Sequence, residues 1–420
     1  MSSAASRGAA PPIAVSGSGV VSPIGIGLRA FEESLFVGRS AIRSHVIELP
    51  GLEVPPVPIA AANFDAASVV APSRLPLDRA TAMALVAAEE AAAQAGLAAS
   101  GIDGERLGVF WGSGMAGAST FEATCRTVYA DRRRMRPTSV VTTMPNAPTA
   151  ELALRFGARG AALAYACACA SSAVAIGEAM RAIRAGWIDV AIAGGSESLL
   201  TPGVVAGWQA MRVLAPLAAD ASAATAARAC RPFAADRAGF ALGEAAAAFI
   251  IESAEHARAR GATPMWQLTG YATNCDGVHI TNPDAAGQAR AMRAALADAG
   301  LAAADIGHLN AHCTATLTGD AAEAASIAAV FGVRGVAVTS TKAIHGHLLG
   351  AGGAVELLAA ACALAGARLP PTAGTTVIDP AFAIDLVLGE ARPAPALSHA
   401  MSSSFAFGGT NAVLIASRVA

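Results

Sequence analysis

Short apolar runs rich in β-branched residues alternate along this chain with longer alanine-rich stretches whose apolar residues recur at helical spacing. Glycines and small polar residues separate the two kinds of segment. We expect strands at residues 13–15, 109–111, 189–193 and 336–339, with helices between them. This alternation is typical of a layered α/β fold with mostly parallel strands.

Three segments of the first half of the chain are echoed, in the same order, in the second half. The pairs are 13–22 with 266–275, 91–103 with 295–307, and 190–200 with 405–415. Alanine-rich helices resemble one another by composition, but three echoes in one order indicate a duplicated fold. We expect an N-terminal half over residues 1–262 and a C-terminal half over residues 263–420.

Composition and charge exclude some classes of protein. A formal net charge of −2 over 420 residues gives no broad basic field, so no nucleic acid partner is expected. The N-terminal stretch resembles neither a secretory signal nor a transit peptide, and the seven cysteines form no disulfide framework, which favours a cytoplasmic protein. The apolar run 351–367 is short for a membrane span and carries Glu356, so we expect a buried helix and no membrane span.

The first chemical candidate is the CAC sequence of Cys167 and Cys169, which precedes the predicted helix SSAVAIGEAMRAIRAG. Cys169 stands at the helix N-terminus, where free N–H groups and the helix dipole favour the thiolate, the nucleophilic form of cysteine. Cys167 lies two residues further back, in the extended lead-in. The alternative is that both are small core residues, as unpaired cysteines often are.

Histidines that could assist a nucleophile follow two predicted strands. Of eight histidines, His312 and His347 lie in loops at predicted strand ends, and His347, like Cys169, precedes a helix. Alternatively, His345 and His347 bind zinc together with a cysteine, although no further ligand stands at a suitable spacing. The chain's only lysine, Lys342, lies five residues before His347.

A glycine-rich FAFGGTN segment near the C-terminus could bind phosphate, but it lacks the lysine of a P-loop and the GxGxxG spacing. A tight turn with free N–H groups is the better interpretation. Such a turn could help to form an oxyanion hole.

Six motifs stand in one order: ACASSAVAIG, DVAIAGGSES, RPFAADRAGFALGEAA, NAHCTATLTGD, STKAIHGHLLGAGGAVE and SSFAFGGTN. Through them the chain resembles, nearly end to end, the β-ketoacyl-acyl carrier protein synthases, the elongating condensing enzymes of the thiolase superfamily. The resemblance implies a thiolase-like fold of two related α/β halves in a layered αβαβα core. It also implies decarboxylative Claisen condensation of an acyl thioester with malonyl-acyl carrier protein, in fatty acid or polyketide biosynthesis. The product is a 3-oxoacyl-acyl carrier protein, and no metal or organic cofactor is needed.

Carried over by position, the resemblance makes Cys169 the acylated nucleophile of the N-terminal half. His312 and His347 become the pair in the C-terminal half that assists decarboxylation. Lys342 orders the site through its ammonium group and pairs with Glu356. A planar arginine fork would not readily replace that compact charge.

Further positions match family residues that surround the nucleophile. Phe407 matches the gating phenylalanine, and its backbone N–H and that of Cys169 would form the oxyanion hole. Thr314 and Thr316 match positions that contact the pantetheine arm, although loop hydroxyls are often only caps. Met115 lies where the family lines the acyl pocket, and it or Phe407 could instead be an ordinary core residue.

The expected partner is an acidic acyl carrier protein, which favours a basic docking patch. The positions that match docking residues are Arg79, Arg133, Arg134 and Arg231. The alternative for a run of arginines is an ordinary solvated face. The family norm is a homodimer, and a heterodimer with a related subunit is the other possibility.

Three positions depart from the family pattern: Cys313 and Ala406 replace glycines, and Ser403 stands where asparagine is usual. They affect the expected loop mobility and substrate range more than the reaction. One alternative is the condensing subunit of a specialised type II polyketide synthase heterodimer. A second is a non-catalytic chain-length-factor-like partner, against which Cys169 argues. A third is a degradative thiolase, against which the two-histidine pattern argues.

Overall fold

One large sheet runs through the molecule and joins its two halves. The computed structural model describes residues 11–49, 51 and 53–419. Within these residues twelve strands form a sheet of order β14-β12-β11-β16-β17-β10-β1-β9-β7-β5-β6, with β2 beside β1. Strands β1 (Ile13–Ser22) and β10 (Trp266–Cys275) pair antiparallel at its centre and so connect the halves.

Strand order is mirrored on the two sides of this central pair. The N-terminal side holds β9 (Ala245–Ser253), β7 (Val190–Glu197), β5 (Leu107–Gly112), β6 (Ala162–Tyr165) and the short β2 (Gly25–Ile26). The C-terminal side holds β17 (Thr410–Ser417), β16 (His399–Phe405), β11 (His308–Asn310), β12 (Ala337–Thr339) and β14 (Asp385–Leu386). Counted outward, β1, β9, β7 and β5 match β10, β17, β16 and β11, as a duplicated fold requires.

Parallel pairing is limited to the outer parts of the sheet. It joins β14, β12, β11 and β16 on one side and β7, β5 and β6 on the other. In the central part of the sheet, from β16 through β17, β10, β1 and β9 to β7, every pair of neighbouring strands is antiparallel. The expectation of mostly parallel strands is therefore wrong for the centre, because the halves meet there through antiparallel neighbours. All four expected strands are present, within β1, β5, β7 and β12.

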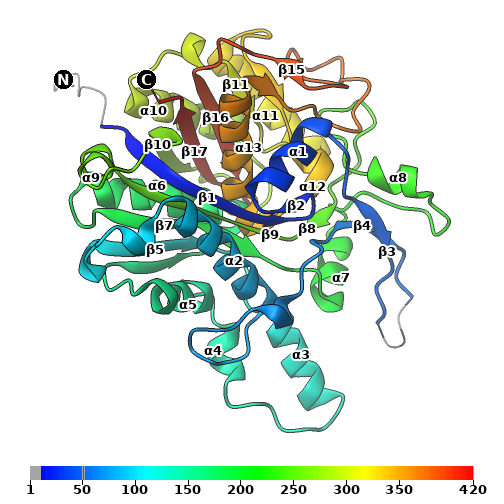
Figure 1. Cartoon of the computed structure of the whole chain (residues 1–420). Coiled ribbons are helices and arrows are strands. Elements are labelled where there is room, and N and C mark those ends of the chain that lie inside the picture. The colour runs from blue at the N-terminus through cyan, green and yellow to red at the C-terminus, as the bar shows by residue number, and fades with distance from the viewer. Residues whose placement is uncertain (1–10, 50, 52, 420) are drawn as a thin grey trace.

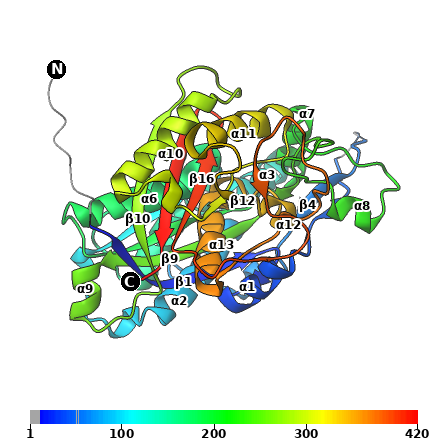
Figure 2. The ribbon, with the colours of Figure 1, turned by 90° about the horizontal axis from the view of Figure 1, so that it is seen from above.

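Helices cover both faces of each half, and two helices lie between the halves. Helices α6 (Ser171–Arg184) and α13 (Gly352–Gly366) pack against each other in the middle layer. Helices α2 (Arg79–Gln94) and α5 (Ala147–Phe156) cover the outer side of the N-terminal half, and α10 (Ala285–Ala299) and α11 (Leu317–Phe331) that of the C-terminal half. Figure 2 shows α13 between α10 and α11 on one side and α2 on the other. The expected αβαβα layering is confirmed.

The sequence echoes are not equally meaningful. Gly96 and Gly300, which correspond in the second echo, both have left-handed φ angles, of 62° and 67°, at the ends of α2 and α10. Strands β1 and β10 span the two segments of the first echo. The third echo is wrong, because β7 occupies 190–197 whereas 405–415 contains a turn before β17, and the true counterpart of β7 is β16.

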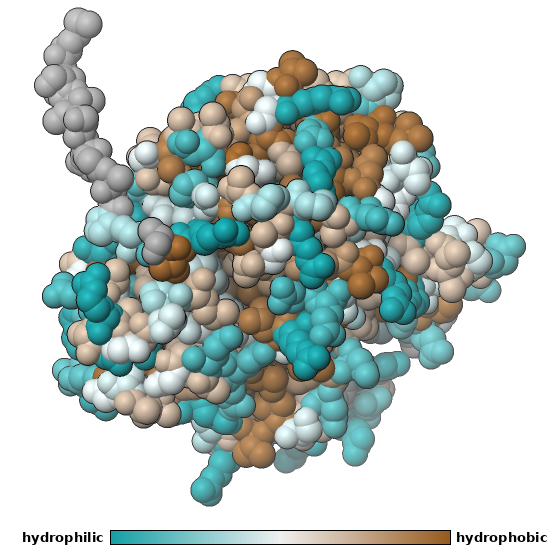
Figure 3. Space-filling model, turned by 45° about the horizontal axis from the view of Figure 1, so that its top comes forward, coloured by the Kyte–Doolittle hydropathy of each residue, from teal (hydrophilic) through white to brown (hydrophobic). Residues whose placement is uncertain are grey.

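Helix α13 shows where the apolar residues of this chain go. Its residues 352–364 are all buried, and all of them except Glu356 are apolar or glycine, so the helix packs into the core on every side. Among the described residues only this region, Leu349–Gly366, is long and apolar enough to cross a membrane by length and composition, and 89% of it is buried inside the fold. It is a core helix, as expected. On the surface in Figure 3, hydrophilic side chains separate smaller hydrophobic patches.

The remaining elements decorate this core. Two small sheets contain β3 (Arg43–His45), β4 (Val57–Ala60) and β8 (Leu242–Gly243), and β13 (Arg368–Leu369) with β15 (Arg392–Pro393). The other helices are α1 (Leu28–Val37), α3 (Ala118–Tyr129), α4 (Ser139–Thr143), α7 (Pro202–Ala210), α8 (Ala223–Ala227), α9 (Ala254–Ala259) and α12 (Lys342–His345). Figure 1 shows the β3–β4 hairpin and the α3–α4 region projecting from the body.

Candidate active site

Cys169 lies where the middle layer begins. It occupies a 3₁₀ turn, Ala168–Ala170, that leads directly into α6, so it stands at a helix N-terminus as the sequence predicts. The residue before it, Ala168, has a left-handed φ of 47°. Cys169 is 7% exposed and lines a cavity of about 250 Å³, which His312 and His347 also line. Cys167 is half-buried and is absent from that lining.

The two predicted histidines meet the cysteine in this cavity. Nε2 of His347 lies 3.1 Å from Sγ of Cys169, and the rings of His312 and His347 are 5.3 Å apart, nearly perpendicular. Burial, with a further effect of Lys342, holds the pKa of each imidazole well below its usual range, so both rings are neutral near pH 7. Within the described chain, Nδ1 of neither ring has a hydrogen-bond partner.

Cys169, the candidate nucleophile, is held as a thiol rather than a thiolate. Burial raises the pKa of Cys169 to about 12, although Lys342 and the backbone N–H of Phe407 act in the opposite direction. The helix N-terminus is expected to favour the thiolate, whereas burial of the sulfur acts in the opposite direction and raises its pKa. Proton transfer to His347, which is within hydrogen-bond distance, is the available route to a thiolate.

Lys342 and Glu356 form the expected pair at the bottom of the site. Nζ of Lys342 donates to Oε1 of Glu356, and the two side chains are 0% and 1% exposed. Burial raises the pKa of Glu356, and the positive charge of Lys342 opposes that rise. Glu356 lies on α13 and Lys342 begins α12, so the pair fixes the segment that carries His347 to the central helix.

His345 does not form the alternative zinc pair with His347. Its Nδ1 lies 2.7 Å from the carbonyl oxygen of Gly346 and its Nε2 2.9 Å from Oγ1 of Thr341, so both ring nitrogens are engaged. The ligand atoms that do approach one another, within 4.8 Å, are those of Cys169, His312 and His347.

Sequence reasoning missed the carboxylates that hold the site from behind. Oε1 of Glu323 accepts hydrogen bonds from the backbone N–H of His312 and from Oγ of Ser403, both at 2.8 Å. Ser403, which replaces the usual asparagine, therefore still serves the site through its hydroxyl. Cys313 is buried beside His312 and lines the cavity. Glu323 stands eleven residues after His312, just beyond the NAHCTATLTGD motif. Its spacing from His312 gave no reason to select it.

Aromatic side chains surround the mouth of the cavity. The ring of Phe407 stacks on Trp208 of α7 at 6.2 Å, and Trp208 contacts Phe240, whose ring meets that of His347 edge-on at 5.1 Å. Gly408 and Gly409 follow Phe407 with φ of 87° and 77°, a conformation open mainly to glycine. The turn expected in FAFGGTN is therefore present and places Phe407 beside Cys169, while Trp208 and Phe240 had no sequence signal.

The other expected site residues divide into two groups. Thr314 and Thr316 line the cavity, with their Oγ1 atoms 3.1 Å apart. Met115 is 49% exposed and is absent from the lining of this cavity.

The four predicted docking arginines also differ from one another. Arg79 forms a bidentate pair with buried Glu244 and donates to two carbonyl groups, and Arg231 is held by Asp236 and Arg228. Their guanidinium groups are therefore committed to contacts inside the chain. Arg133 and Arg134 are exposed between α3 and α4.

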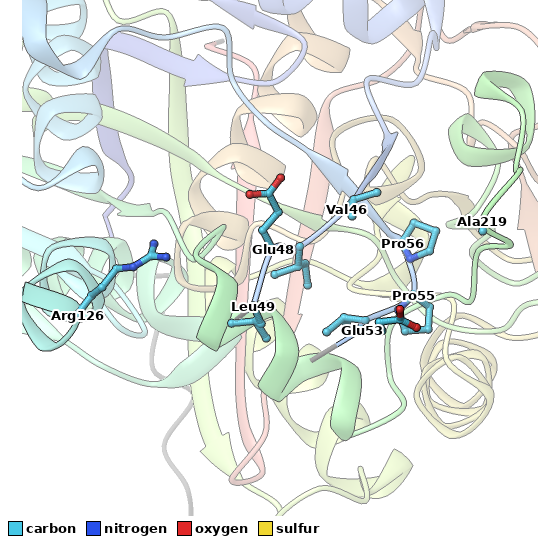
Figure 4. A pocket seen from close by; sticks show the side chains of 10 residues that line it. Val46, Glu48, Leu49, Glu53, Pro55, Pro56, Arg126 and Ala219 are labelled. Atoms are coloured by element: carbon cyan, nitrogen blue, oxygen red, sulfur yellow. The ribbon is translucent and has the colours of Figure 1, made fainter. Parts of the chain in front are cut away.

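A second hollow, of about 830 Å³, is distinct from the cavity at Cys169. It lies beside the β3–β4 hairpin and is lined mostly by apolar residues, with Glu48, Glu53 and Arg126 (Figure 4). The two hollows share no lining residue. The nucleophile and both histidines thus open into the smaller cavity alone.

Comparison with known families agrees with this arrangement. The model of the "Beta-ketoacyl synthase, N-terminal domain" matches residues 10–257, and that of the "Beta-ketoacyl synthase, C-terminal domain" matches residues 266–376. The chain belongs to the β-ketoacyl synthase family. It is a condensing acyltransferase of fatty acid or polyketide synthesis, and the synthase shares the thiolase fold of its structural neighbours.

Two relatives resemble this synthase over nearly its whole length. It is 37% identical over 412 residues to Nodulation protein E of Rhizobium meliloti (strain 1021), covering 96% of this chain and 98% of the relative. It is 35% identical over 413 residues to 3-oxoacyl-[acyl-carrier-protein] synthase 2 of Staphylococcus aureus (strain N315), covering 96% and 97%.

Two solved structures have the same fold throughout. One is a type II polyketide synthase acyl-carrier protein in complex with its ketosynthase, with a TM-score of 0.87 at 27% identity. The other is the ishigamide ketosynthase/chain length factor, with a TM-score of 0.87 at 28% identity. Each comparison covers 98% of this synthase and 100% of the other chain.

The buried pair gives a stability prediction. Lys342→Met should lower the free energy of unfolding by roughly 3–5 kcal/mol, because the Glu356 carboxylate stays buried without its cation. The double variant Lys342→Met/Glu356→Gln should recover part of that loss. Urea denaturation measures both, with Arg29→Met, which breaks an exposed pair with Glu33, as the control that leaves the midpoint unchanged. A Lys342→Met protein as stable as the wild type would contradict the prediction.

Proposed function

We propose that this synthase transfers an acyl group from an acyl carrier protein to Cys169 and condenses it with malonyl-acyl carrier protein. The product is a 3-oxoacyl-acyl carrier protein. The observation that carries this proposal is the contact between the Cys169 thiol and a neutral His347, with a second neutral histidine in the same small cavity.

In the first step the thiol proton of Cys169 passes to Nε2 of His347, and the sulfur attacks the carbonyl carbon of the acyl thioester. The backbone N–H of Phe407, which already points at Cys169, supports an oxyanion hole together with the N–H of Cys169. The carbon–sulfur bond to the carrier arm breaks, the arm takes the proton from His347, and the acyl group stays on Cys169.

In the second step the malonyl thioester loses carbon dioxide, and the electron pair of the broken carbon–carbon bond stays on the thioester, which becomes an enolate. His312 donates to the enolate oxygen, and neutral His347 does so once its proton moves from Nδ1, which has no partner in the described chain, to Nε2. The enolate carbon attacks the acyl carbon and releases the Cys169 sulfur. Thr314 and Thr316 lie in the cavity wall where hydroxyls would bind the amide groups of the pantetheine arm.

Two alternatives concern the setting of this reaction. A heterodimeric type II polyketide synthase subunit is supported by the similar ketosynthase solved with a chain length factor. A non-catalytic partner is opposed by the complete set of Cys169, His312 and His347 in contact. A cytoplasmic location is supported by seven cysteines that are all free thiols. We keep the division into halves 1–262 and 263–420 as part of this proposal.

We also propose a dimer, formed with a second copy or a related chain. Strand β6 lies at the edge of the large sheet, and its Leu163 is 45% exposed, so its backbone is open to pairing. Large apolar side chains are exposed nearby in sequence: Phe121, Tyr129, Met135, Val140, Val141, Met144 and Leu154. Light scattering of the purified chain tests this, and a monomer at all concentrations would contradict the homodimer.

His312 separates the two steps of the reaction. His312→Ala leaves the contact between Cys169 and His347 in place, so acyl transfer to Cys169 should persist. Condensation should fall by ~10²- to 10³-fold, because one donor to the enolate is lost. Mass spectrometry of the acyl-enzyme and a condensation assay measure the two steps. Condensation at the wild-type rate would rule out this role for His312.

Carrier-protein docking is proposed at Arg133 and Arg134, since both are exposed and outside any ion pair in the described chain. Reversing both charges should weaken binding of an acidic acyl carrier protein by roughly tenfold at low salt and flatten its salt dependence. The control is Arg29→Glu on α1, whose side chain is 94% exposed. Unchanged affinity in Arg133→Glu/Arg134→Glu, measured by titration at several salt concentrations, would place docking elsewhere.

A further inference from the structure

Glu197 is a buried carboxylate that the reaction itself does not use. It ends β7 and is 0% exposed. Its carboxylate accepts hydrogen bonds from Oγ of Ser113 at 3.1 Å and from the backbone N–H groups of Gly114 at 2.6 Å, Met115 at 3.1 Å and Gly350 at 3.2 Å. In the described chain no arginine, lysine or histidine forms an ion pair with it. Four donors therefore hold this carboxyl group without a cation; burial raises its pKa to about 7, and the four hydrogen bonds oppose that rise.

These donors come from the two halves of the molecule. Gly114 and Met115 follow β5 of the N-terminal half, whereas Gly350 stands three residues after His347 in the C-terminal half. The carboxylate thus links the two halves through hydrogen bonds. It connects the Gly114 and Met115 segment, beside the turn that carries Cys169, to the segment that follows His347.

The junction around Glu197 is packed too closely for any side chain. A Cβ on Gly350 would lie 2.3 Å from the nitrogen of Gly114 and 2.5 Å from Oε2 of Glu197. A Cβ on Gly114 would lie 2.7 Å from the same oxygen and 3.8 Å from the carbonyl oxygen of Ala168, the residue before Cys169. The carboxylate is therefore in direct contact with backbone next to both catalytic segments.

Both catalytic segments also contain strained backbone at this junction. Ala168 has a φ of 47° and Leu349 a φ of 49°, a region that residues other than glycine rarely adopt. Such conformations persist only where surrounding contacts impose them. Leu349 lies between His347 and the Gly350 N–H that Glu197 holds.

We propose that Glu197 is a positioning residue that keeps the His347 segment against the Cys169 segment and so maintains the contact between Nε2 and Sγ. This inference rests on the proposed roles of Cys169 and His347. A carboxylate suits the position because it only accepts hydrogen bonds, and every partner here can donate. Its negative charge raises the pKa of Cys169. Glu197 therefore serves the site by positioning the two segments and not by its charge.

Two substitutions at Glu197 should slow condensation to different extents. Glu197→Gln can keep the bonds to Gly114 and Gly350 through its carbonyl oxygen but places an NH₂ group against the N–H of Met115, so condensation kcat should fall by roughly tenfold. Glu197→Met has similar length and no acceptor, so kcat should fall by about 10²-fold, as expected for a catalytic group displaced by about 1 Å. The KM for malonyl-acyl carrier protein should stay unchanged in both, because Glu197 is not among the residues that line the cavity at Cys169.

Two controls separate positioning from stability and from charge. Glu252→Gln removes another buried carboxylate, which pairs with Arg260 away from the cavity, and should lower the melting temperature without changing kcat. Glu197→Met alone should also slow acyl transfer to Cys169, but in a His347→Ala background it should slow that step no further, since its effect passes through His347.

Full additivity of Glu197→Met with His347→Ala, or a rate of acyl transfer that rises when the charge is removed, would overturn the proposal. An unchanged kcat in Glu197→Met would do the same. Failure of the wild-type protein to acylate Cys169 would instead contradict the proposed function, so the two outcomes are distinguishable.

Discussion

The proposed chemistry of this synthase depends on one contact between its halves, the 3.1 Å approach of His347 Nε2 to Cys169 Sγ. The same burial that makes the contact possible raises the pKa of the thiol and lowers that of the imidazole. Both groups are therefore neutral at rest, and the proton can move only when substrate gives the thiolate a carbonyl carbon to attack. Positions 178 residues apart must be held to within a few tenths of an ångström for this to work.

The fold supplies that precision through its duplication. The N-termini of α6 and α13, equivalent helices of the two halves, meet in the middle layer, so the residues that precede them face each other. The antiparallel pair β1 and β10 fixes the halves on the sheet side. Buried charges then secure the loops: Lys342 with Glu356 behind His347, and Glu323 behind His312. The histidines remain neutral because burial disfavours their charged form, and the positive charge of Lys342 adds to that effect.

The sequence carried much of this account, and its failures have physical causes. Short runs rich in β-branched residues located four of the strands, and the position of Cys169 before a helix followed from local signals. The antiparallel centre could not be predicted, because strand direction depends on pairing between halves that no local pattern records. Trp208 and Phe240 were missed because aromatic residues in a sequence are usually interpreted as core residues. Arg79 and Arg231 were expected to be free for docking because a sequence does not show whether an arginine is bound inside the chain or exposed. Glu197 and Glu323 were missed because a buried carboxylate is recognised by its donors, which are mostly backbone groups distant in sequence.

The central claim is that Cys169, and not its neighbour Cys167, carries the acyl group. The most direct test incubates the wild type, Cys169→Ala and Cys167→Ala with an acyl carrier protein thioester and locates the adduct by fragmentation of the peptide that contains both residues. The account predicts an adduct on Cys169 in the wild type and in Cys167→Ala, because only Cys169 lies in the cavity beside His347. It predicts none in Cys169→Ala. An acyl group found on Cys167, or one that persists in Cys169→Ala, would contradict it.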